Sequence, residues 1–140
     1  AISQPIGDLN GKVKKLLDIT QEALYLGIKK AVPENFLFDI SNAIQSHVEA
    51  HGFSVVRDFV GHGIGKSMHE EPEIPNFGKP HSGPKIKQGM VFAIEPMVNM
   101  GSWEVEVLDN GWTAVTKDRA LSAHFEHTIA VTDDKPLILT

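Results

Sequence analysis

Two histidines seven residues apart are the side chains of this sequence best suited to chemistry. His62 and His69 lie in the segment GHGIGKSMHEEP at residues 61–72, where glycines flank the first imidazole. Because glycine has no Cβ, a ligand or another backbone segment can approach closely there. An imidazole can bind a metal ion or transfer a proton near neutral pH. The segment therefore predicts part of an active site.

Two glutamates occupy apolar, strand-like runs further along the chain. Glu95 lies in VFAIEPMV at residues 91–98, and Glu126 lies in AHFEHTI at residues 123–129. Burial of an ionised carboxylate is costly unless the group is paired, hydrogen-bonded or bound to a metal. Strand alternation places Glu126 on the same face as His124. This pattern allows a polar row that faces a site, and a solvent-facing strand edge is the alternative.

Hydrophobic periodicity predicts the elements that position these side chains. Apolar residues at three- and four-residue steps predict amphipathic helices over residues 8–31 and 36–50. Asp8 or Asn10 can accept hydrogen bonds from the free amides of the first helix, and Asn35 can do so for the second. Histidine and carboxylate are the available metal ligands, because the chain contains no cysteine.

The second half of the chain has the pattern of an antiparallel sheet. Short β-branched and aromatic runs predict strands at residues 53–60, 91–98, 123–132 and 137–139. Residues 103–116 alternate around Asp109-Asn110-Gly111 and predict a hairpin, whereas residues 72–90 are rich in turn residues and predict a loop. Two helices followed by such a sheet make this an α+β chain.

The composition is typical of one globular domain. A chain of 140 residues with 41% hydrophobic residues can form a core, since it buries roughly 70% of the surface exposed in the unfolded chain. The net charge of −5 argues against a nucleic-acid partner, because phosphate binding requires clustered lysine and arginine. No apolar run reaches the length of about 18 residues that suggests a membrane span, so we expect no membrane partner.

Five motifs in sequence order resemble those of methionine aminopeptidases of the compact bacterial and organellar type, in the creatinase or "pita-bread" fold family. The motifs are GHGIG, HEEP, IEPM at residues 94–97, DNGWT at 109–113 and FEHT at 125–128. The resemblance covers almost the whole chain. It implies that residues 1–140 form the C-terminal half of this fold, with two helices packed on an antiparallel sheet.

The resemblance also implies a centre of two divalent metal ions that hydrolyses a peptide bond. His62 and Glu95 match ligands of one ion, and Glu126 matches a ligand that bridges both. Imidazole with carboxylate oxygens suits Co, Mn, Fe or Zn and does not select firmly among them. Two such ions can activate a water molecule and stabilise the tetrahedral oxyanion.

Further residues match positions that contact the substrate in this family. His69 matches the histidine that hydrogen-bonds the scissile amide or its developing oxyanion, and Glu95 also matches the carboxylate that exchanges protons with the nucleophilic water. Met68 and Trp112 match walls of the pocket for the methionine side chain, with ordinary core packing as the alternative. His81, His124 and His127 receive no role.

The family's other metal ligands are two aspartates in an N-terminal half, which also carries a histidine that contacts substrate. Asp8, Asp18 and Asp39 lie in predicted helices and do not match those positions. Three ligands from this chain would leave a two-metal centre under-coordinated. We therefore expect the chain alone to be inactive or nearly so, and we expect the missing N-terminal half to be a partner.

The function implied by the resemblance is removal of N-terminal methionine from peptides and nascent proteins. Its partners would be methionyl peptides, nascent chains and the ribosome, in the cytoplasm or an organelle. A non-catalytic peptide-binding module of the same fold is one alternative, because a fold does not settle function. A proline-directed aminopeptidase or dipeptidase is another, although the EPM and FEHT stretches look more like the methionine enzyme.

Overall fold

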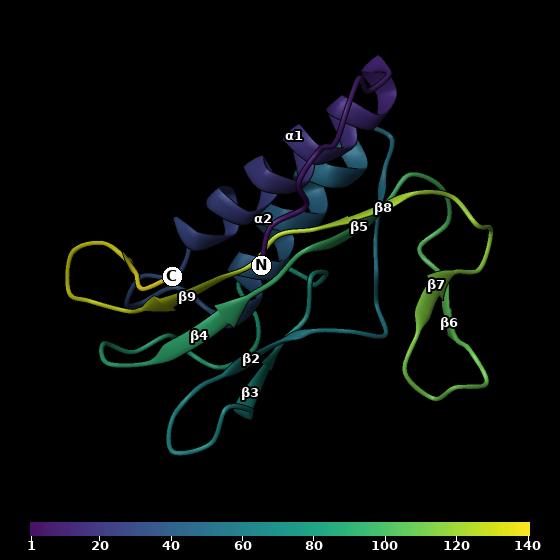
Figure 1. Ribbon diagram of the computed structural model, residues 1–140. Helices are drawn as coiled ribbons and strands as arrows, with labels where there is room; N and C mark the ends of the chain where they lie inside the picture. The colour runs from purple at the N-terminus through teal and green to yellow at the C-terminus, as the bar shows by residue number, and fades with distance from the viewer.

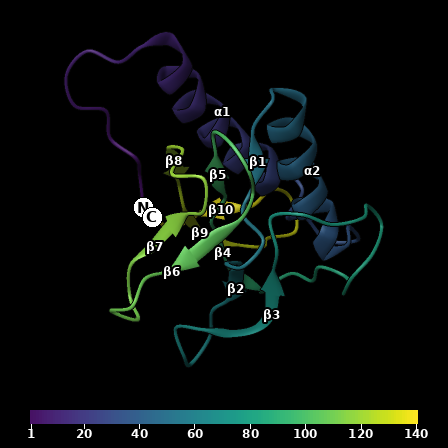
Figure 2. The same ribbon diagram turned by 90° about the vertical axis from the view of Figure 1, so that its right-hand side faces the viewer.

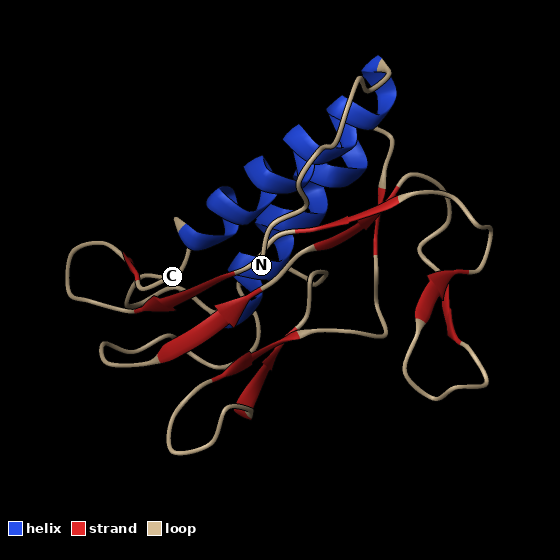
Figure 3. Cartoon of the chain, in the orientation of Figure 1, coloured by secondary structure: helices blue, strands red, loops and turns tan.

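Two helices form a layer along one side of a set of short antiparallel strands. The computed structural model describes residues 1–140, with α1 (Gly11–Ile28) and α2 (Leu37–Ala50) packed against each other and against the strands (Figures 1 and 3). Neither helix is long and apolar enough to cross a membrane. The predicted α+β architecture, with two helices packed on an antiparallel sheet, is confirmed.

The strands form a three-stranded sheet, a five-stranded sheet and a hairpin. The first sheet has the order β1 (Ser54–Val55), β5 (Met97–Asn99), β8 (Ser122–His124). The second has the order β10 (Leu137–Ile138), β9 (His127–Ala130), β4 (Val91–Ile94), β2 (Gly61–Gly63), β3 (Glu70–Ile74). The hairpin pairs β6 (Val105–Val107) with β7 (Ala114–Thr116), and it lies apart from the helices at the right of Figure 1 and nearest the viewer in Figure 2.

The core lies between the helices and the strands. It joins the inward faces of both helices to apolar side chains from β1, β3, β4, β5, β8 and β9, including Leu16, Leu24, Ile40, Ile44, Val55, Ile74, Phe92, Ile94, Val98, Ala123 and Ile129. Burying a side chain of this size stabilises the fold by about 1.5–3 kcal/mol relative to leaving it exposed. This packing holds the strands in place beneath the helices.

The start of α1 follows one of the two predicted caps. The Asn10 side chain accepts hydrogen bonds from the backbone N–H groups of Lys12 and Val13 at 3.1 and 3.0 Å. Asn10, and not Asp8, therefore satisfies amides that have no partner within the helix. The helix is shorter than the predicted range of residues 8–31.

The start of α2 differs from the prediction. Asn35 was expected to cap this helix, but its side chain donates to the carbonyl oxygen of Lys30, and Phe36 is the capping residue. The Phe36 side chain makes no capping hydrogen bond. Asp39, in the first turn, supplies a carboxylate that accepts the Phe36 N–H at 2.8 Å and the His81 N–H at 2.8 Å. The carboxylate thus ties the start of the helix to a distant loop.

The loop predicted at residues 72–90 begins later than expected. β3 continues to Ile74, which pairs with Gly61 of β2. The prediction was wrong here because only Ile74 in this stretch has the buried, apolar character of a strand residue.

The hairpin prediction is confirmed, and the Asn110 side chain accepts hydrogen bonds from Trp112 N and Thr113 N at its turn.

Asp39→Ala should destabilise the protein by about 1 kcal/mol at pH 7, the usual effect of losing a helix cap. Burial raises the pKa of the Asp39 carboxyl, but the N–H groups of His81 and Phe36 outweigh burial and hold the pKa below its ordinary value. A lowered folded-state pKa stabilises the protein above the unfolded pKa of about 3.9, and this contribution is lost as pH falls through the folded value.

Urea unfolding of both proteins between pH 7 and pH 3 measures this effect. The difference in unfolding free energy should be constant near neutral pH and should narrow below about pH 4. Asp58→Ala, at an exposed aspartate, is the matched control and should leave stability nearly unchanged. A difference for Asp39→Ala that does not depend on pH would contradict the role of its ionised carboxylate.

Candidate active site

The site forms at two interruptions that lie side by side, one between β4 and β5 and the other between β8 and β9. β4 ends at Ile94 and β5 begins at Met97, while β8 ends at His124 and β9 begins at His127. β4 pairs with β9 and β5 pairs with β8, so the two breaks lie side by side between the two sheets. Pro96 contributes to the interruption because it has no N–H to donate to a ladder.

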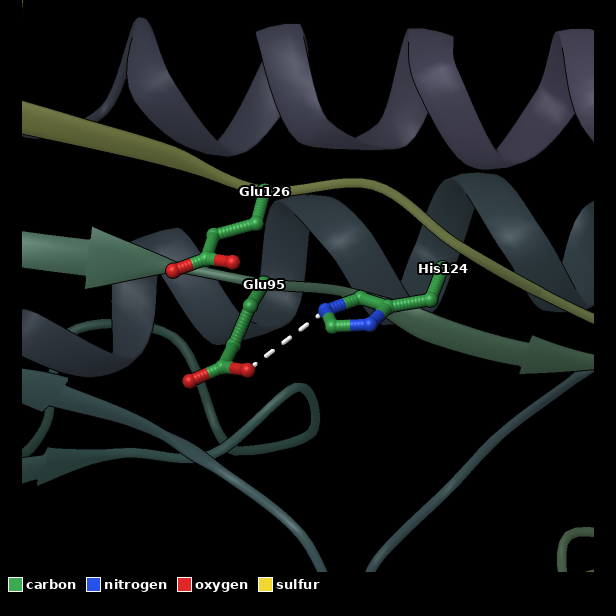
Figure 4. A group of neighbouring side chains, drawn as sticks. All are labelled: Glu95, His124 and Glu126. Carbon is green, nitrogen blue, oxygen red and sulfur yellow. Dashed lines mark ion pairs between the residues drawn. The ribbon is translucent and has the colours of Figure 1, made fainter. Parts of the chain in front are cut away.

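Each break contains one of the glutamates predicted to bind metal. Outside regular strand pairing, the side chains of Glu95 and Glu126 both enter the same space, which His124 also enters from the end of β8 (Figure 4). One donor atom from each of these three residues lies within 4.8 Å of the other two. Donor atoms bound to one ion at about 2.1 Å lie up to about 4.2 Å apart, so the cluster needs only a small contraction.

The electrostatics of the cluster favour a cation. Glu95 and Glu126 are both partly buried, with side-chain exposures of 17% and 29%. Two carboxylates that approach in such surroundings repel each other unless a cation or a proton compensates them. Oxygen and imidazole donors of this kind suit Mn, Fe, Co or Zn. The residues present therefore fit a divalent metal ion.

His62 approaches Glu95 from the neighbouring strand β2. Its Nε2 lies 3.7 Å from Glu95 Oε1, and its Nδ1 lies 3.0 Å from the carbonyl oxygen of Gly63. Because a carbonyl can only accept, Nδ1 carries a proton directed to Gly63, and in the neutral ring Nε2 then offers its lone pair toward Glu95. Metal-binding histidines commonly use one ring N–H in this way, so His62 has the tautomer of a ligand.

The glycines beside His62 allow β2 to lie close to its neighbours. A Cβ added to Gly61 would meet the carbonyl oxygen of Ala93, and one added to Gly63 would meet the carbonyl oxygen of Glu71. Both obstacles are backbone atoms, which cannot move aside as the end of a side chain can. The two glycines thus allow the strand of His62 to lie close to both β4 and β3.

His69 lies beside His62, immediately before β3. The two ring centroids are 4.2 Å apart, with an angle of 47° between the planes. Both rings line an open hollow of about 420 Å³ whose rim carries Glu70, Glu71 and Glu73. An exposed imidazole at this position can reach a ligand that enters the hollow.

The two residues predicted to wall a pocket do not line this hollow. Met68 is 74% exposed, and Trp112, at the turn of the β6–β7 hairpin, is 90% exposed. Neither lines the hollow beside His62 and His69. Core packing, the alternative considered for both side chains, is excluded by this exposure.

The sequence prediction omitted His124, which the structure places in the cluster. A signal was present, because strand alternation put His124 on the face of Glu126. Its proximity to Glu95 could not be predicted in this way, since that distance depends on the pairing of β5 with β8. His127, by contrast, contacts the Tyr25 hydroxyl of α1 at 3.3 Å.

The segment at residues 1–3 lies along the break between β8 and β9. Glu126 N donates to Ala1 O at 2.9 Å, and Ser3 Oγ bonds both the backbone N–H and the carbonyl oxygen of His124 at 2.9 Å. The Ala1 amino nitrogen lies 3.4 Å from Glu126 Oε2. These bonds hold the backbone of the second break in place.

The structure brings the three predicted ligands, His62, Glu95 and Glu126, close together and sets His69 next to His62. Asp39, one of the aspartates that did not match the family's ligands, is engaged at the start of α2 and belongs to no metal-binding group. The assignment of His62, Glu95 and Glu126 as ligands stays a prediction.

Comparison with known proteins agrees with this geometry. The chain is 59% identical over 135 residues to a methionine aminopeptidase of Clostridium perfringens, an alignment that covers 96% of this chain and 54% of that protein. It is 52% identical over 140 residues to methionine aminopeptidase 1 of Bacillus subtilis, which covers 100% of this chain and 56% of that protein. The chain thus spans about half the length of the curated relatives it matches.

Solved structures show the same relationship. A methionine aminopeptidase from Thermotoga maritima superposes with a TM-score of 0.94 at 48% identity and covers 96% of this chain and 54% of that one. A prolidase from Pyrococcus horikoshii has a TM-score of 0.72 at 21% identity over 96% of this chain and 33% of that one, and shares the fold alone. The model of metallopeptidase family M24 matches residues 2–133, so this chain belongs to that family.

Proposed function

We propose that this chain forms one half of a two-metal aminopeptidase that removes N-terminal methionine from peptides and nascent proteins. The observation that carries the proposal is that Glu95 and Glu126 approach each other at adjacent strand breaks, with His62 facing the Glu95 carboxylate. The high identity to proteins named methionine aminopeptidase supports methionine as the residue removed. We also propose that the protein acts in the cytoplasm or an organelle, on chains that leave the ribosome.

In this proposal three side chains of the chain hold two divalent ions, of Co, Mn, Fe or Zn. His62 and Glu95 would hold one ion, and Glu126 would serve as a ligand of both. When bound, the ions lower the pKa of a water molecule and polarise the peptide carbonyl. The cluster fits this use because two carboxylates and an imidazole nitrogen with a free lone pair already face one another.

Proton transfer is assigned to Glu95. A carboxylate oxygen of Glu95 accepts a proton from the attacking water and returns it to the nitrogen of the departing amine. A carboxylate can act in this way when it lies within hydrogen-bond reach of the water. Its partial burial and the neighbouring imidazoles keep the group in a defined position.

His69 is assigned to the scissile carbonyl. A ring N–H of His69 donates a hydrogen bond to the carbonyl oxygen as negative charge develops on it. The ring is close to His62 and faces the hollow through which a substrate can approach.

Met68 and Trp112 are proposed to contact the methionine side chain, and their exposure leaves them free to do so.

The remaining ligands are proposed to come from an N-terminal half of the fold. No aspartate belongs to the cluster, and the chain spans about half of each relative it matches. With three ligands for two ions, the 140 residues alone should not sustain hydrolysis. The second half would supply the missing carboxylates and close the exposed side of the site.

Combining this chain with the N-terminal half of the Clostridium perfringens relative should produce an enzyme, because that half would complete the ligand set. Release of methionine from Met-Ala-Ser in the presence of Mn²⁺ or Co²⁺ is the measurement. We expect turnover by the complex and almost none by the 140 residues alone. Glu126→Gln in the complex is the control and should abolish turnover.

Three outcomes would contradict the proposal. Enzyme-like turnover by the isolated chain would show that three ligands suffice. A preference for an X-Pro peptide over Met-Ala-Ser would favour a proline-directed enzyme. A folded complex without stoichiometric metal would favour a peptide-binding module.

His69→Ala in the active complex should lower kcat by about 10²–10³ and leave the metal content intact, as expected for loss of one donor to the oxyanion. Steady-state kinetics and metal analysis of the same preparation are the measurements. His81→Asn is the matched control, because His81 is an exposed histidine away from the site with a positive φ that asparagine tolerates. Unchanged kcat for His69→Ala would remove this side chain from the mechanism.

A further inference from the structure

We propose that His124 is a positioning residue for Glu95. In this inference, which rests on the proposed function, the Nε2–H group of His124 donates a hydrogen bond to Glu95 Oε2. That bond holds the carboxylate so that Oε1 remains directed toward His62 and the metal ion. His124 itself binds neither the ion nor the substrate.

The first reason is a buried nitrogen without a partner. His124 Nε2 is inaccessible to solvent and makes no hydrogen bond, although 38% of the side chain is exposed. The facing acidic atom is Glu95 Oε2, at 3.5 Å (Figure 4). Burying a polar group unpaired is unfavourable by about 1–3 kcal/mol. A contraction of a few tenths of an ångström would convert this contact into a hydrogen bond.

The second reason is the division of the Glu95 carboxylate between two imidazoles. Oε1 lies 3.7 Å from His62 Nε2, whereas Oε2 lies 3.5 Å from His124 Nε2. His62 directs its proton to Gly63 through Nδ1, so its Nε2 offers a lone pair and needs a cation between itself and Oε1. Nδ1 of His124 makes no such bond, so its Nε2 is free to carry the proton.

The third reason is that both backbones are fixed. His124 pairs with Met97, two residues after Glu95, and its backbone N–H and carbonyl oxygen both bond to Ser3 Oγ. The carbonyl oxygen of Glu95 accepts a hydrogen bond from Asn76 Nδ2 at 3.2 Å. The imidazole therefore stands at the end of β8, and the carboxylate stands two residues before the strand that pairs with it, each on a backbone held by hydrogen bonds, as a positioning contact requires.

A metal-ligand role for His124 makes the opposite prediction for its proton. A ligand nitrogen must offer a lone pair, whereas a positioning donor must carry hydrogen on the same atom. In a neutral imidazole only one nitrogen is protonated. The tautomer of His124 therefore distinguishes the two roles before any metal is added.

Long-range ¹H–¹⁵N NMR of the ¹⁵N-labelled 140-residue chain, at about pH 8.5 where an ordinary imidazole is neutral, measures this directly. We expect His124 to carry its proton on Nε2. His62 is the internal reference and should carry its proton on Nδ1. The imidazole signal that is missing from the spectrum of the His124→Gln variant is thereby assigned to His124. A proton on Nδ1 of His124 would overturn the proposal.

Metal binding by two variants gives an independent measurement. Glutamine keeps an N–H donor at similar reach, so His124→Gln should bind Co²⁺ within about threefold of the parent chain in calorimetry. His124→Leu removes the donor and should weaken binding by about 10–100-fold, the usual effect of losing an outer-shell partner. Equal weakening by both variants, or no weakening by leucine, would overturn the positioning role.

The two proposals fail in different ways. Absence of Co²⁺ binding by the parent chain and by its complex with an N-terminal half would contradict the proposed function, and the His124 tautomer would still decide the present inference. Strong Co²⁺ binding with His124 protonated on Nδ1 would leave the proposed function in place and refute the inference. Folding of each variant is checked by its NMR spectrum.

Discussion

Close approach of two carboxylates is the constraint on which this site depends. Oxygens of Glu95 and Glu126 lie within 4.8 Å of each other in partly buried surroundings. Without a positive charge between them, their repulsion and desolvation would oppose the packing that brings them together. A divalent ion reverses the sign of this interaction, and membership of a metallopeptidase family agrees with that solution.

The fold sustains this approach through the residues beside each break. Ile94 and Phe125, which directly precede the two glutamates, are buried in the core. The apolar side chains anchor each strand under the helices, while the next side chain turns to the other side, as alternation along an extended backbone requires. Hydrophobic burial therefore supplies the free energy that holds two acidic groups in an unfavourable position.

The histidines of the site are suited to different roles because their ring nitrogens meet different partners. His62 uses Nδ1 on a backbone carbonyl and so presents a lone pair, whereas His124 presents a buried nitrogen to the outer oxygen of Glu95. His69 has a ring contact with His62 and faces an open hollow. Identical side chains can therefore bind an ion, orient a carboxylate or approach a substrate, according to what each ring nitrogen meets.

Local patterns in the sequence determined much of this protein. The periodicity of apolar residues predicted both helices and the hairpin, because each depends on neighbours within a few residues. The motifs predicted His62, Glu95 and Glu126 as one group. The tertiary structure alone decided that Asp39, in the first turn of α2, ties the Phe36 cap to the loop at His81 and that β3 pairs with the glycines of β2. It also brought His124 to Glu95 across a strand pair, since contacts between residues far apart in sequence depend on register and packing that no local pattern encodes.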